Sequence, residues 1–373
     1  MQPTASDSTK IPTSALPNDH AELRDWLRLY RSRRVGPMTF IRLIRAHGNA
    51  AAALAALPKL AADSGAKDYT PYTIDAAEQE LQQGFAAGAQ LLCLGAADYP
   101  QLLANISDPP SILWALGDPT LAQKPCVALV GARNASSLGR RMAARLAEGL
   151  AKEGFVVVSG MARGIDAAAH DAAMEGGTIA VQAGGVDNIY PKENNMLAEK
   201  IATSGLRLAE MAIGVQPQAR HFPRRNRIIS GIAQAVVVVE GASRSGSLIT
   251  AKDALDQGRE VMAVPGNPMD GRAAGCNILI RDGAILVRSA QDIIEALAHS
   301  NEVVPEIAQK VERKSEGDLP TALLSLLGPT PISEDTLIRE VEWPAHKVLS
   351  AILDLELAQK VERHAGGTIA TVV

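Results

Sequence analysis

The chain has 373 residues, of which 47% are hydrophobic and 21% are charged, and its formal net charge at pH 7 is −4. This length predicts about two or three domains, and this composition excludes a chain that is disordered throughout. Aromatic residues make up only 3% of the chain, so an aromatic stacking surface would depend on very few residues. Because the net charge is negative, any binding to nucleic acid would have to depend on local basic clusters.

The cysteines and histidines offer no pattern for a metal or a disulfide. Cys93, Cys126 and Cys276 lie far apart without a CxxC pair, and the histidines include no HExxH pair. We therefore predict no metal site and no cofactor, with reduced thiols in a cytoplasmic protein. Residues 1–18 are rich in Thr, Ser and Pro and predict a disordered tail rather than a signal peptide. No run of about 18 apolar residues occurs, so we predict no membrane span.

Residues 19–118 show a mostly helical spacing of apolar residues, with a tight turn at residues 33–37 between two helices. We predict a helical N-terminal domain over this range. Residues 21–48 hold seven arginines against two acidic residues, a local charge of +5. A solvated helix face and a contact with phosphates both explain this charge, and the first explanation is the more common one.

Short runs of apolar residues, separated by helical patterns, fill the middle of the chain. They lie at residues 127–130, 155–158, 178–181, 236–239, 261–264 and 284–287. Strands that are apolar throughout are typical of a parallel sheet covered on both faces. We therefore predict a doubly wound, Rossmann-like α/β domain over residues 119–299.

The C-terminal part predicts a charged linker at residues 300–316 and a winged helix-turn-helix at residues 317–373. Three helical patterns, at residues 320–327, 333–341 and 344–360, precede a short hairpin through Gly366 and Gly367. Residues 315–373 contain four basic and nine acidic residues, and the presumed recognition helix offers only His346 and Lys347 as basic contacts. Binding to a partner or a structural role therefore explains this domain at least as well as reading a DNA groove.

The loops that follow the strands carry the candidate site, because open α/β sheets bind ligands beyond the carboxyl ends of their strands. After the first strand, Gly131 opens a turn that leads through Ser136 to a helix N-terminus, where free N–H groups favour an anion. Arg133 stands where a dinucleotide fold has its second glycine, and the second strand ends in Ser159-Gly160 rather than an acidic residue. A nucleotide cofactor is therefore disfavoured, whereas a guanidinium suits a phosphodiester.

Asp166 and His170 follow the second strand, after Arg163. We interpret Asp166 as the cap of a helix that begins at residue 167, and His170 as a packed helix residue. A catalytic Asp–His pair would need a nucleophile, and the sequence has no GxSxG elbow. We therefore predict that this pair is structural.

Basic residues recur in the later loops. Lys192 is a phosphate candidate, and Tyr190 either stacks on a base or anchors its loop. The densest cluster surrounds Phe222 and consists of Arg224, Arg225, Asn226 and Arg227. Basic side chains around an aromatic ring are typical of single-strand binding. Together with the loop of Ser245, Gly246 and Ser247, these segments predict an extended phosphate track. A nuclease is disfavoured, because the sequence shows neither a pair of carboxylates nor metal ligands beside these loops.

The motifs in combination resemble a bacterial family, the DNA-processing protein A (DprA/Smf) family. They are GAR at 131–133, SGMARGIDAAAH at 159–170, YP at 190–191, RRNRIISG at 224–231 and SGSLITA at 245–251. The resemblance covers about residues 95–297. It implies an extended Rossmann-like domain, a helical N-terminal domain of the sterile-alpha-motif or helix-hairpin-helix kind, and a C-terminal winged helix.

The resemblance also implies a function and a site. A family member would bind single-stranded DNA, protect incoming DNA during natural transformation and load the recombinase RecA, without catalysis. It would form a homodimer through the Rossmann-like domain. The surfaces for the dimer and for RecA would lie near the C-terminal part of that domain, where the candidate residues are Ile278, Leu279, Ile285 and Leu286. Arg133 would be the principal phosphate arginine, and Lys192, Arg224, Arg225 and Arg227 would add contacts. The predicted DNA-binding residues are Gly131, Arg133, Ser136, Ser159, Gly160, Arg163, Lys192, Phe222, Arg224, Arg225, Asn226, Arg227, Ser245, Gly246 and Ser247.

Two other interpretations stay open. One is a nucleotide hydrolase of the lysine-decarboxylase-like (LOG) type, which has a similar layout but a PGGxGTxxE signature that the segment from Pro265 and Gly266 does not match. The other is a transcription factor that uses the winged helix, which the acidic charge of that domain disfavours.

Overall fold

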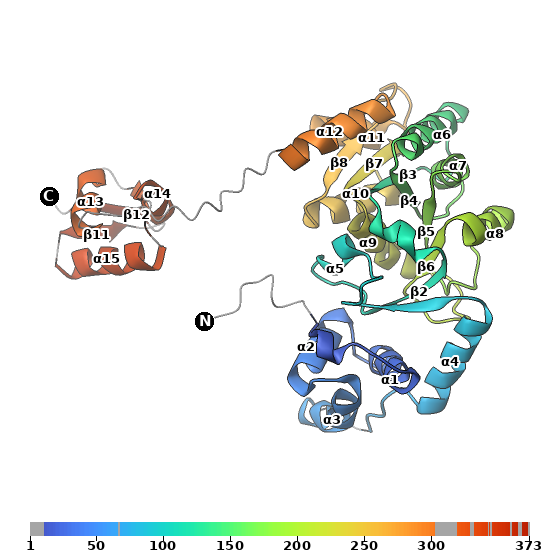
Figure 1. The fold of residues 1–373 in the computed structure, drawn as a ribbon. Coiled ribbons are helices and arrows are strands. Elements are labelled where there is room, and N and C mark those ends of the chain that lie inside the picture. The colour runs from blue at the N-terminus through green and yellow to red at the C-terminus, as the bar shows by residue number, and fades with distance from the viewer. Residues whose placement is uncertain are drawn as a thin grey trace. The chain divides into compact units, whose positions relative to one another are not determined.

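The computed structural model describes residues 11–65, 68–302, 319–328, 332–341, 343, 345–358, 360–364 and 368–371. The chain divides into two compact units, Met1–Val304 and Pro305–Val373 (Figure 1). Among the described residues, none of the helices is both long and apolar enough to cross a bilayer.

The first unit begins with a 3-10 turn, η2 (Thr13–Ala15), followed by α1 (His20–Arg31), α2 (Pro37–His47), α3 (Ala50–Asp63) and α4 (Ile74–Ala86). Their apolar faces meet in one cluster, in which the rings of Trp26 and Phe40 pack edge to face, 5.0 Å apart. Residues 11–18 depart from the disordered tail that we expected. Ala15 is buried, and Trp26 Nε1 donates a hydrogen bond to its carbonyl at 3.0 Å. Residues 1–10 lie outside the described part of the chain.

A nine-stranded sheet forms the centre of the described first unit, in the order β1-β2-β6-β5-β4-β3-β7-β8-β9. The strands are β1 (Gln90–Cys93), β2 (Ile112–Gly117), β3 (Cys126–Gly131), β4 (Val156–Ser159), β5 (Thr178–Gln182), β6 (Leu206–Ala209), β7 (Ala235–Glu240), β8 (Glu260–Ala263) and β9 (Ile285–Leu286). From β6 to β9 the neighbours are parallel. The predicted doubly wound α/β fold is confirmed, with all six predicted strands present.

The sequence did not predict three strands of this sheet. β6 is one, and β1 and β2 lie in the range that we expected to be helical. β1 pairs antiparallel with β2, and β2 pairs antiparallel with β6. The domain boundary placed after residue 118 therefore cuts through the sheet. The physical reason is that short apolar runs have the same composition in a buried strand and in a helix turn, so periodicity does not separate them.

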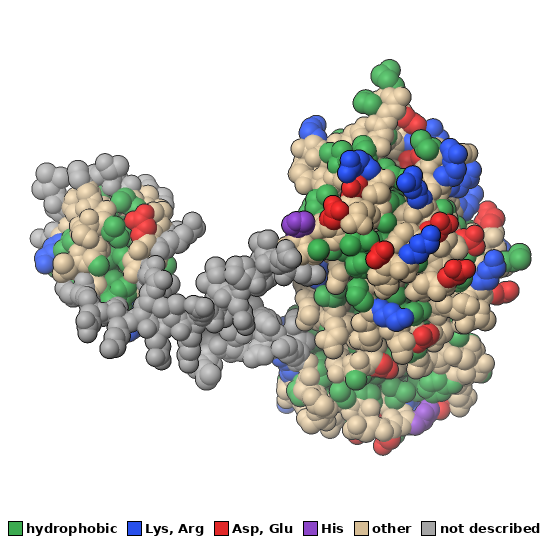
Figure 2. Space-filling model, turned by 45° about the horizontal axis from the view of Figure 1, so that its top comes forward, with side chains coloured by type: hydrophobic (Ala, Val, Ile, Leu, Met, Phe, Trp, Pro, Cys, Tyr) green, Lys and Arg blue, Asp and Glu red, His purple; other side chains and the backbone are tan. Residues whose placement is uncertain are grey.

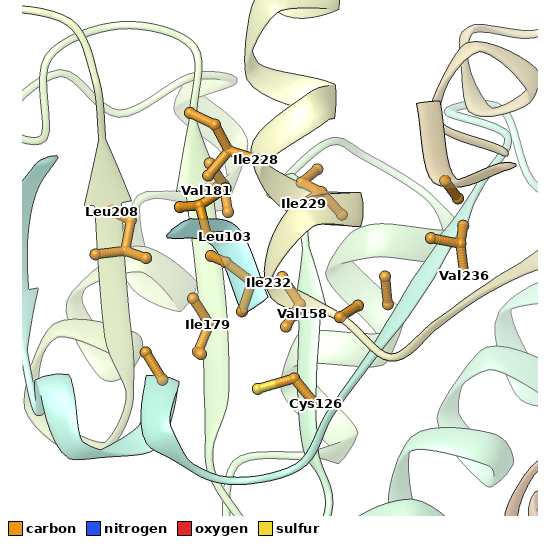
Figure 3. Packing of buried hydrophobic residues seen from close by; sticks show 14 of the residues in the cluster. Leu103, Cys126, Val158, Ile179, Val181, Leu208, Ile228, Ile229, Ile232 and Val236 are labelled. Atoms are coloured by element: carbon orange, nitrogen blue, oxygen red, sulfur yellow. The ribbon is translucent and has the colours of Figure 1, made fainter. Parts of the chain in front are cut away.

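Helices cover both faces of the sheet. On one face lie α6 (Ser137–Lys152), α7 (Ile165–Ala172), α8 (Asn195–Ser204) and α12 (Ala290–Glu302). On the other lie α5 (Gln101–Ala104), α9 (His221–Ile232), α10 (Gly246–Asp256) and α11 (Ala274–Arg281). Short 3-10 turns, η3 (Pro119–Gln123) and η4 (Lys192–Asn194), complete the unit. Figure 3 shows Ile228, Ile229 and Ile232 of α9 facing the buried strand residues, which fixes α9 on the sheet.

A buried polar network joins the N-terminal helices to the sheet. Arg31 pairs with Glu80 at 2.8 Å and donates to the carbonyl of Glu210 at 3.0 Å. Tyr30 donates its hydroxyl hydrogen to the carboxylate of Glu210, and Arg227 of α9 pairs with the same carboxylate at 2.7 Å. All of these side chains are largely excluded from water, so each charge depends on its partner.

The second unit contains α13 (Leu319–Leu326), β10 (Ile332–Ser333), α14 (Glu334–Glu340), α15 (Ala345–Leu357), β11 (Val361–His364) and β12 (Thr368–Thr371). β12 pairs antiparallel with both β10 and β11. The centre of the hydrophobic core of this unit consists of Leu323, Leu337, Val348 and Ile352. The predicted winged helix is thus confirmed. α12 continues to Glu302, beyond the expected start of the linker, and both the rest of the linker and the turn at Gly366 and Gly367 lie outside the described residues.

Candidate nucleic-acid interface

The carboxyl ends of β3, β4, β5 and β7 open into a groove. A cleft of about 920 Å³ contains residues from the loops after β3 and β7 and from the start of α9. A second cleft, of about 450 Å³, adjoins it and contains Gly160, Arg163 and Lys192. Both clefts are lined by Arg133, Ala162, Tyr190 and Phe222, so they form one continuous groove.

Phe222 is the centre of this groove. The guanidinium carbon of Arg133 lies 4.9 Å from the centroid of its ring, and the ring of Tyr190 meets it edge to face at 5.7 Å. Arg133 is exposed, and Tyr190 is 50% exposed. A cation stacked on an aromatic face, with a second ring beside it, presents both charge and a π surface to a ligand. The loops after β3 and β5 and the start of α9 therefore converge as the sequence predicted.

Arg225 lies beneath Phe222 in the floor of the groove instead of at an exposed position. Its Nη1 donates to the carbonyls of Gly160 at 2.5 Å and Val181 at 2.6 Å. Burial, together with the nearby charge of Arg133, lowers the pKa of Arg225 to about 10. A Cβ at Gly160 would lie 2.1 Å from the same Nη1, so glycine is required there. Arg225 thus ties the ends of β4 and β5 to α9, and its guanidinium carbon lies 6.0 Å from the centroid of the Phe222 ring, which it supports from below.

Asp166 is a structural residue, but not a helix cap. α7 begins at Ile165 with Gly164 as its N-cap, so Asp166 lies inside the helix and reaches back. Its Oδ2 accepts hydrogen bonds from the N–H groups of Gly160 at 3.1 Å and Ala162 at 3.3 Å. Burial raises the pKa of this carboxyl, partly offset by Arg225 and by these N–H donors. The prediction of a cap was wrong because the helix starts earlier than its apolar pattern indicated.

His170 packs in the core, as predicted. It is fully buried, and its Nδ1 lies 2.7 Å from Thr178 Oγ1. Burial lowers the pKa of His170 to about 3. The residue does not reach the groove, and within the described residues no cluster of His, Cys, Asp and Glu has the arrangement of a metal site.

A carboxylate of the protein itself occupies the N-terminus of α6, where we expected a phosphate. Glu240, at the end of β7, accepts from Ser136 N at 3.0 Å and from Ser136 Oγ at 2.6 Å. A Cβ at Gly139 would lie 2.3 Å from Glu240 Oε2, so this position leaves room for the carboxylate. Ser136 therefore holds Glu240, and this end of the sheet lacks the vacant phosphate loop of a nucleotide-binding Rossmann fold. Ser159 is also internal, because it is buried and donates to the carbonyl of Leu129.

The arginines of α9 point in different directions. Arg224 is 57% exposed, with its Nη2 3.9 Å from Glu210. Arg227, by contrast, is only 11% exposed, and Glu210 and Asp108 engage its guanidinium at 2.7 Å and 3.3 Å. Neither Arg224 nor Arg227 lines either cleft, so the structure does not bring these two arginines into the groove with the other candidates. The partners of Arg227, Asp108 and Glu210, lie 119 and 17 residues away in the chain, which explains why the run of basic residues alone did not reveal its burial.

The remaining candidates line the rim of the groove. Lys192 and Arg163 lie on one side, where Arg163 is 63% exposed and lies 3.6 Å from Glu193. On the other side, Ser245 caps α10 by accepting from Ser247 N at 3.4 Å, and Asn226 Nδ2 donates to the carbonyl of Gly246. Gly131 lies at the base, where a Cβ would meet Ile165 at 2.6 Å.

Sequence reasoning missed two arginines of the groove, Arg244 and Arg272. Arg244 stands in the loop after β7 whose Ser and Gly residues we selected, so its charge was the available signal. Arg272 comes from the segment before α11, which only the fold brings to this edge. On the face shown in Figure 2, Lys and Arg side chains are interspersed with Asp and Glu, as expected from the net charge. The groove differs, since its lining contains five arginines and a lysine but only Asp166 and Glu193 as carboxylates.

These features define a class of protein: a Rossmann-like domain with a cationic, aromatic-centred groove in place of a dinucleotide site. Comparison with known proteins gives the family. A model of the family "DNA recombination-mediator protein A" matches residues 90–298, and the chain belongs to this family. A DprA-like N-terminal HHH domain matches residues 20–82, and a DprA winged helix domain matches residues 308–367.

The individual proteins and structures to which the chain is similar belong to the same family. The chain is 45% identical over 217 residues to DNA processing protein DprA of Bacillus subtilis, which covers 57% of this chain and 73% of that protein. It is 38% identical over 277 residues to protein Smf of Escherichia coli, covering 72% and 74%. The crystal structure of DprA from Streptococcus pneumoniae matches with a TM-score of 0.56 and 41% identity, over 60% of this chain and 77% of that one. A structure of DprA from Helicobacter pylori, described for its single-stranded DNA binding mode, matches with a TM-score of 0.53 and 29% identity, over 57% and 96%.

Proposed function

We propose that this protein binds single-stranded DNA in the groove around Phe222 and acts as a non-catalytic mediator of DNA recombination in the cytoplasm. The observation that carries the proposal is the stack of Arg133 on Phe222 with Tyr190 beside it, at a groove edge that several basic loops share. The relative from Helicobacter pylori, described as binding single-stranded DNA, supports the same ligand for this chain.

The groove suits a flexible strand better than a mononucleotide. Glu240 already accepts from the N–H and the hydroxyl of Ser136, the N-cap of α6, so a terminal phosphate would meet a buried carboxylate there. The exposed cations instead lie along both clefts, on Arg133, Arg163, Lys192 and Arg244. Such a row neutralises successive phosphates, while the aromatic pair stacks on a base of any identity. We therefore expect strong salt dependence and little sequence preference.

The test compares Arg133→Gln and Phe222→Leu with the wild type, using homopolymeric single strands and duplex at several salt concentrations. Loss of one single-strand phosphate contact lowers the slope of log affinity against log salt by about 0.7, and loss of a stacked base costs about 1–3 kcal/mol. Arg133→Gln should therefore reduce both the affinity and the slope, whereas Phe222→Leu should reduce mainly the affinity. Arg145→Gln, an exposed change on α6, serves as the matched control. Unchanged binding by both groove variants would contradict the proposal.

We further propose that the protein delivers the bound strand to RecA and acts as a homodimer through the edge of the sheet at β9. Ile278 and Leu286, from α11 and β9, are 37% and 42% exposed at this edge, whereas Leu279 and Ile285 pack partly against the core. Exposed apolar residues beside an unpaired strand suit an interface between two copies. Light scattering of an Ile278→Glu/Leu286→Glu variant should show a monomer, and RecA loading should be measured on strands that carry single-strand-binding protein. A dimer of unchanged mass in this variant would contradict the proposed interface.

A further inference from the structure

The arginines of the N-terminal segment 21–48 fall into two groups in the structure. Arg24, Arg28 and Arg31 of α1 are partly buried and paired: the first two pair with Asp25 at 3.5 Å and 3.0 Å, and Arg31 pairs with Glu80 at 2.8 Å. The other group lies on the turn between α1 and α2 and on α2 itself. Arg33, Arg34 and Arg42 are exposed there, and the described part of the chain gives none of them an ion pair with a carboxylate. The excess positive charge of the segment is therefore concentrated on this hairpin.

The hairpin also has an aromatic ring, that of Tyr69, beside it, and the backbone of its turn is exposed. The guanidinium of Arg33 lies 5.8 Å from the centroid of Tyr69, whose hydroxyl donates to the carbonyl of Arg33 at 2.6 Å. Arg34 adopts a left-handed backbone with φ of 67°, a conformation that is uncommon for residues other than glycine. Among the described residues, and apart from the two chain neighbours of Gly36, nothing lies within 4 Å of the place where a Cβ would be at Gly36, so the backbone of the turn is uncovered there. The cation on a ring repeats the arrangement of Arg133 on Phe222.

Glu210 and the loop that follows it link the base of this hairpin to the side of the groove. The carbonyl of Glu210 accepts from Arg31, the residue that directly precedes the hairpin, and its carboxylate lies 3.9 Å from the exposed Arg224. The loop that follows Glu210 lines the groove with Pro217 and Ala219, and its Ile213 packs against the core of the N-terminal helices. The rim of the groove and the base of the hairpin are therefore neighbours within the first unit.

We propose that the hairpin of Arg33, Arg34 and Arg42 is a second contact surface for DNA, on which the backbone of a single strand continues after it leaves the groove past Arg224. This inference rests on the proposed function. It assigns to the helical N-terminal region a share in the length of DNA that is bound, in addition to its packing against the sheet.

The experiment compares a short and a long strand. Full-length Arg33→Gln/Arg34→Gln/Arg42→Gln protein is titrated with poly-dT of about 6 and about 30 nucleotides, which bracket the roughly 4–16 nucleotides of typical single-strand sites. The short strand should bind as tightly as it does to the wild type. The long strand should bind about ten-fold or more weakly at low salt, with a salt slope smaller by about 2, because each phosphate contact contributes about 0.7.

A second triple variant controls for the change in net charge. Arg141→Gln/Arg145→Gln/Lys152→Gln makes the same change in net charge on the exposed side of α6, and it should leave both strands unaffected. The inference is overturned if the hairpin variant binds the long strand like the wild type, if both strands weaken equally, or if only binding to a protein partner changes. Failure of the wild type to bind either strand would instead contradict the proposed function itself.

Discussion

Two arginine-rich regions, the start of α9 and the hairpin between α1 and α2, show what a run of basic residues means once the chain has folded. In α9, adjacent residues differ completely: Arg224 is exposed, Arg225 holds two strand carbonyls, and Arg227 is an internal counterion of Glu210. In the N-terminal segment the split follows position, with the arginines of α1 partly buried and paired and those of the turn exposed. Burial of one helix face therefore decides which charges are left for a ligand.

The largest effect that sharpens this comparison is expected at Glu210, which is 6% exposed. Glu210→Ala removes the acceptor of Tyr30 and the carboxylate that pairs with Arg227, so a buried charge loses a partner. Breaking a buried pair in this way costs about 3–5 kcal/mol of unfolding free energy, measurable by urea denaturation. Arg224→Gln, which touches the same carboxylate from the surface, should cost less than about 1 kcal/mol yet weaken single-strand binding. Equal destabilisation by both variants would show that α9 does not separate these two roles.

A smaller effect is expected in the floor of the groove. Gly160→Ala places a methyl group against Arg225 Nη1 and displaces it from the carbonyls of Gly160 and Val181. Hydrogen bonds to a charged group contribute about 1.5–3 kcal/mol, so we expect a loss of about 2 kcal/mol together with weaker DNA binding, since Phe222 loses its support. Gly271→Ala, where a Cβ would have open space, is the control. Wild-type stability of Gly160→Ala would rule out a structural role for Arg225.

The third effect, of similar size at pH 5 and absent at neutral pH, concerns the pH dependence of the core beside this floor. The pKa of His170 is about 3 in the folded protein, against 6.5 as its ordinary value. Below pH 6.5 the imidazole of His170 binds a proton in the unfolded chain but not in the folded protein. The contribution of His170 to the free energy of unfolding is therefore fully present above pH 6.5 and is lost progressively as the pH falls towards 3. The loss is about 1.4 kcal/mol per pH unit, or about 2 kcal/mol at pH 5.

Denaturation of the wild type at pH 7 and pH 5 measures this loss. His170→Gln should remove most of the difference, and His299→Gln, at an exposed position, should retain it. An unchanged pH dependence in His170→Gln would assign the effect to other groups.

Much of the fold could be predicted from the sequence, because six strands and their helices carry continuous apolar runs that admit few alternatives. β1, β2 and β6 could not, since their short runs become strands only through pairing with neighbours that are distant in sequence. For the site, Arg133, Lys192 and Phe222 were found from their loops and lie together. Arg227, Ser136 and Ser159 were selected for their side-chain chemistry, and each is engaged by another part of the protein.

The sequence by itself determined six of the parallel strands with their helices, the winged helix and the glycine- and arginine-rich loops at the carboxyl ends of the strands, because these are properties of local composition and period. Only the tertiary structure decided which arginines face a ligand, and that Glu240 fills the start of α6. The physical reason is that buried polar and charged groups need partners. The partners here, Glu210 and Glu240, lie up to 180 residues away in the chain from the side chains that they bind. Such pairings follow from packing and are not written in any single segment.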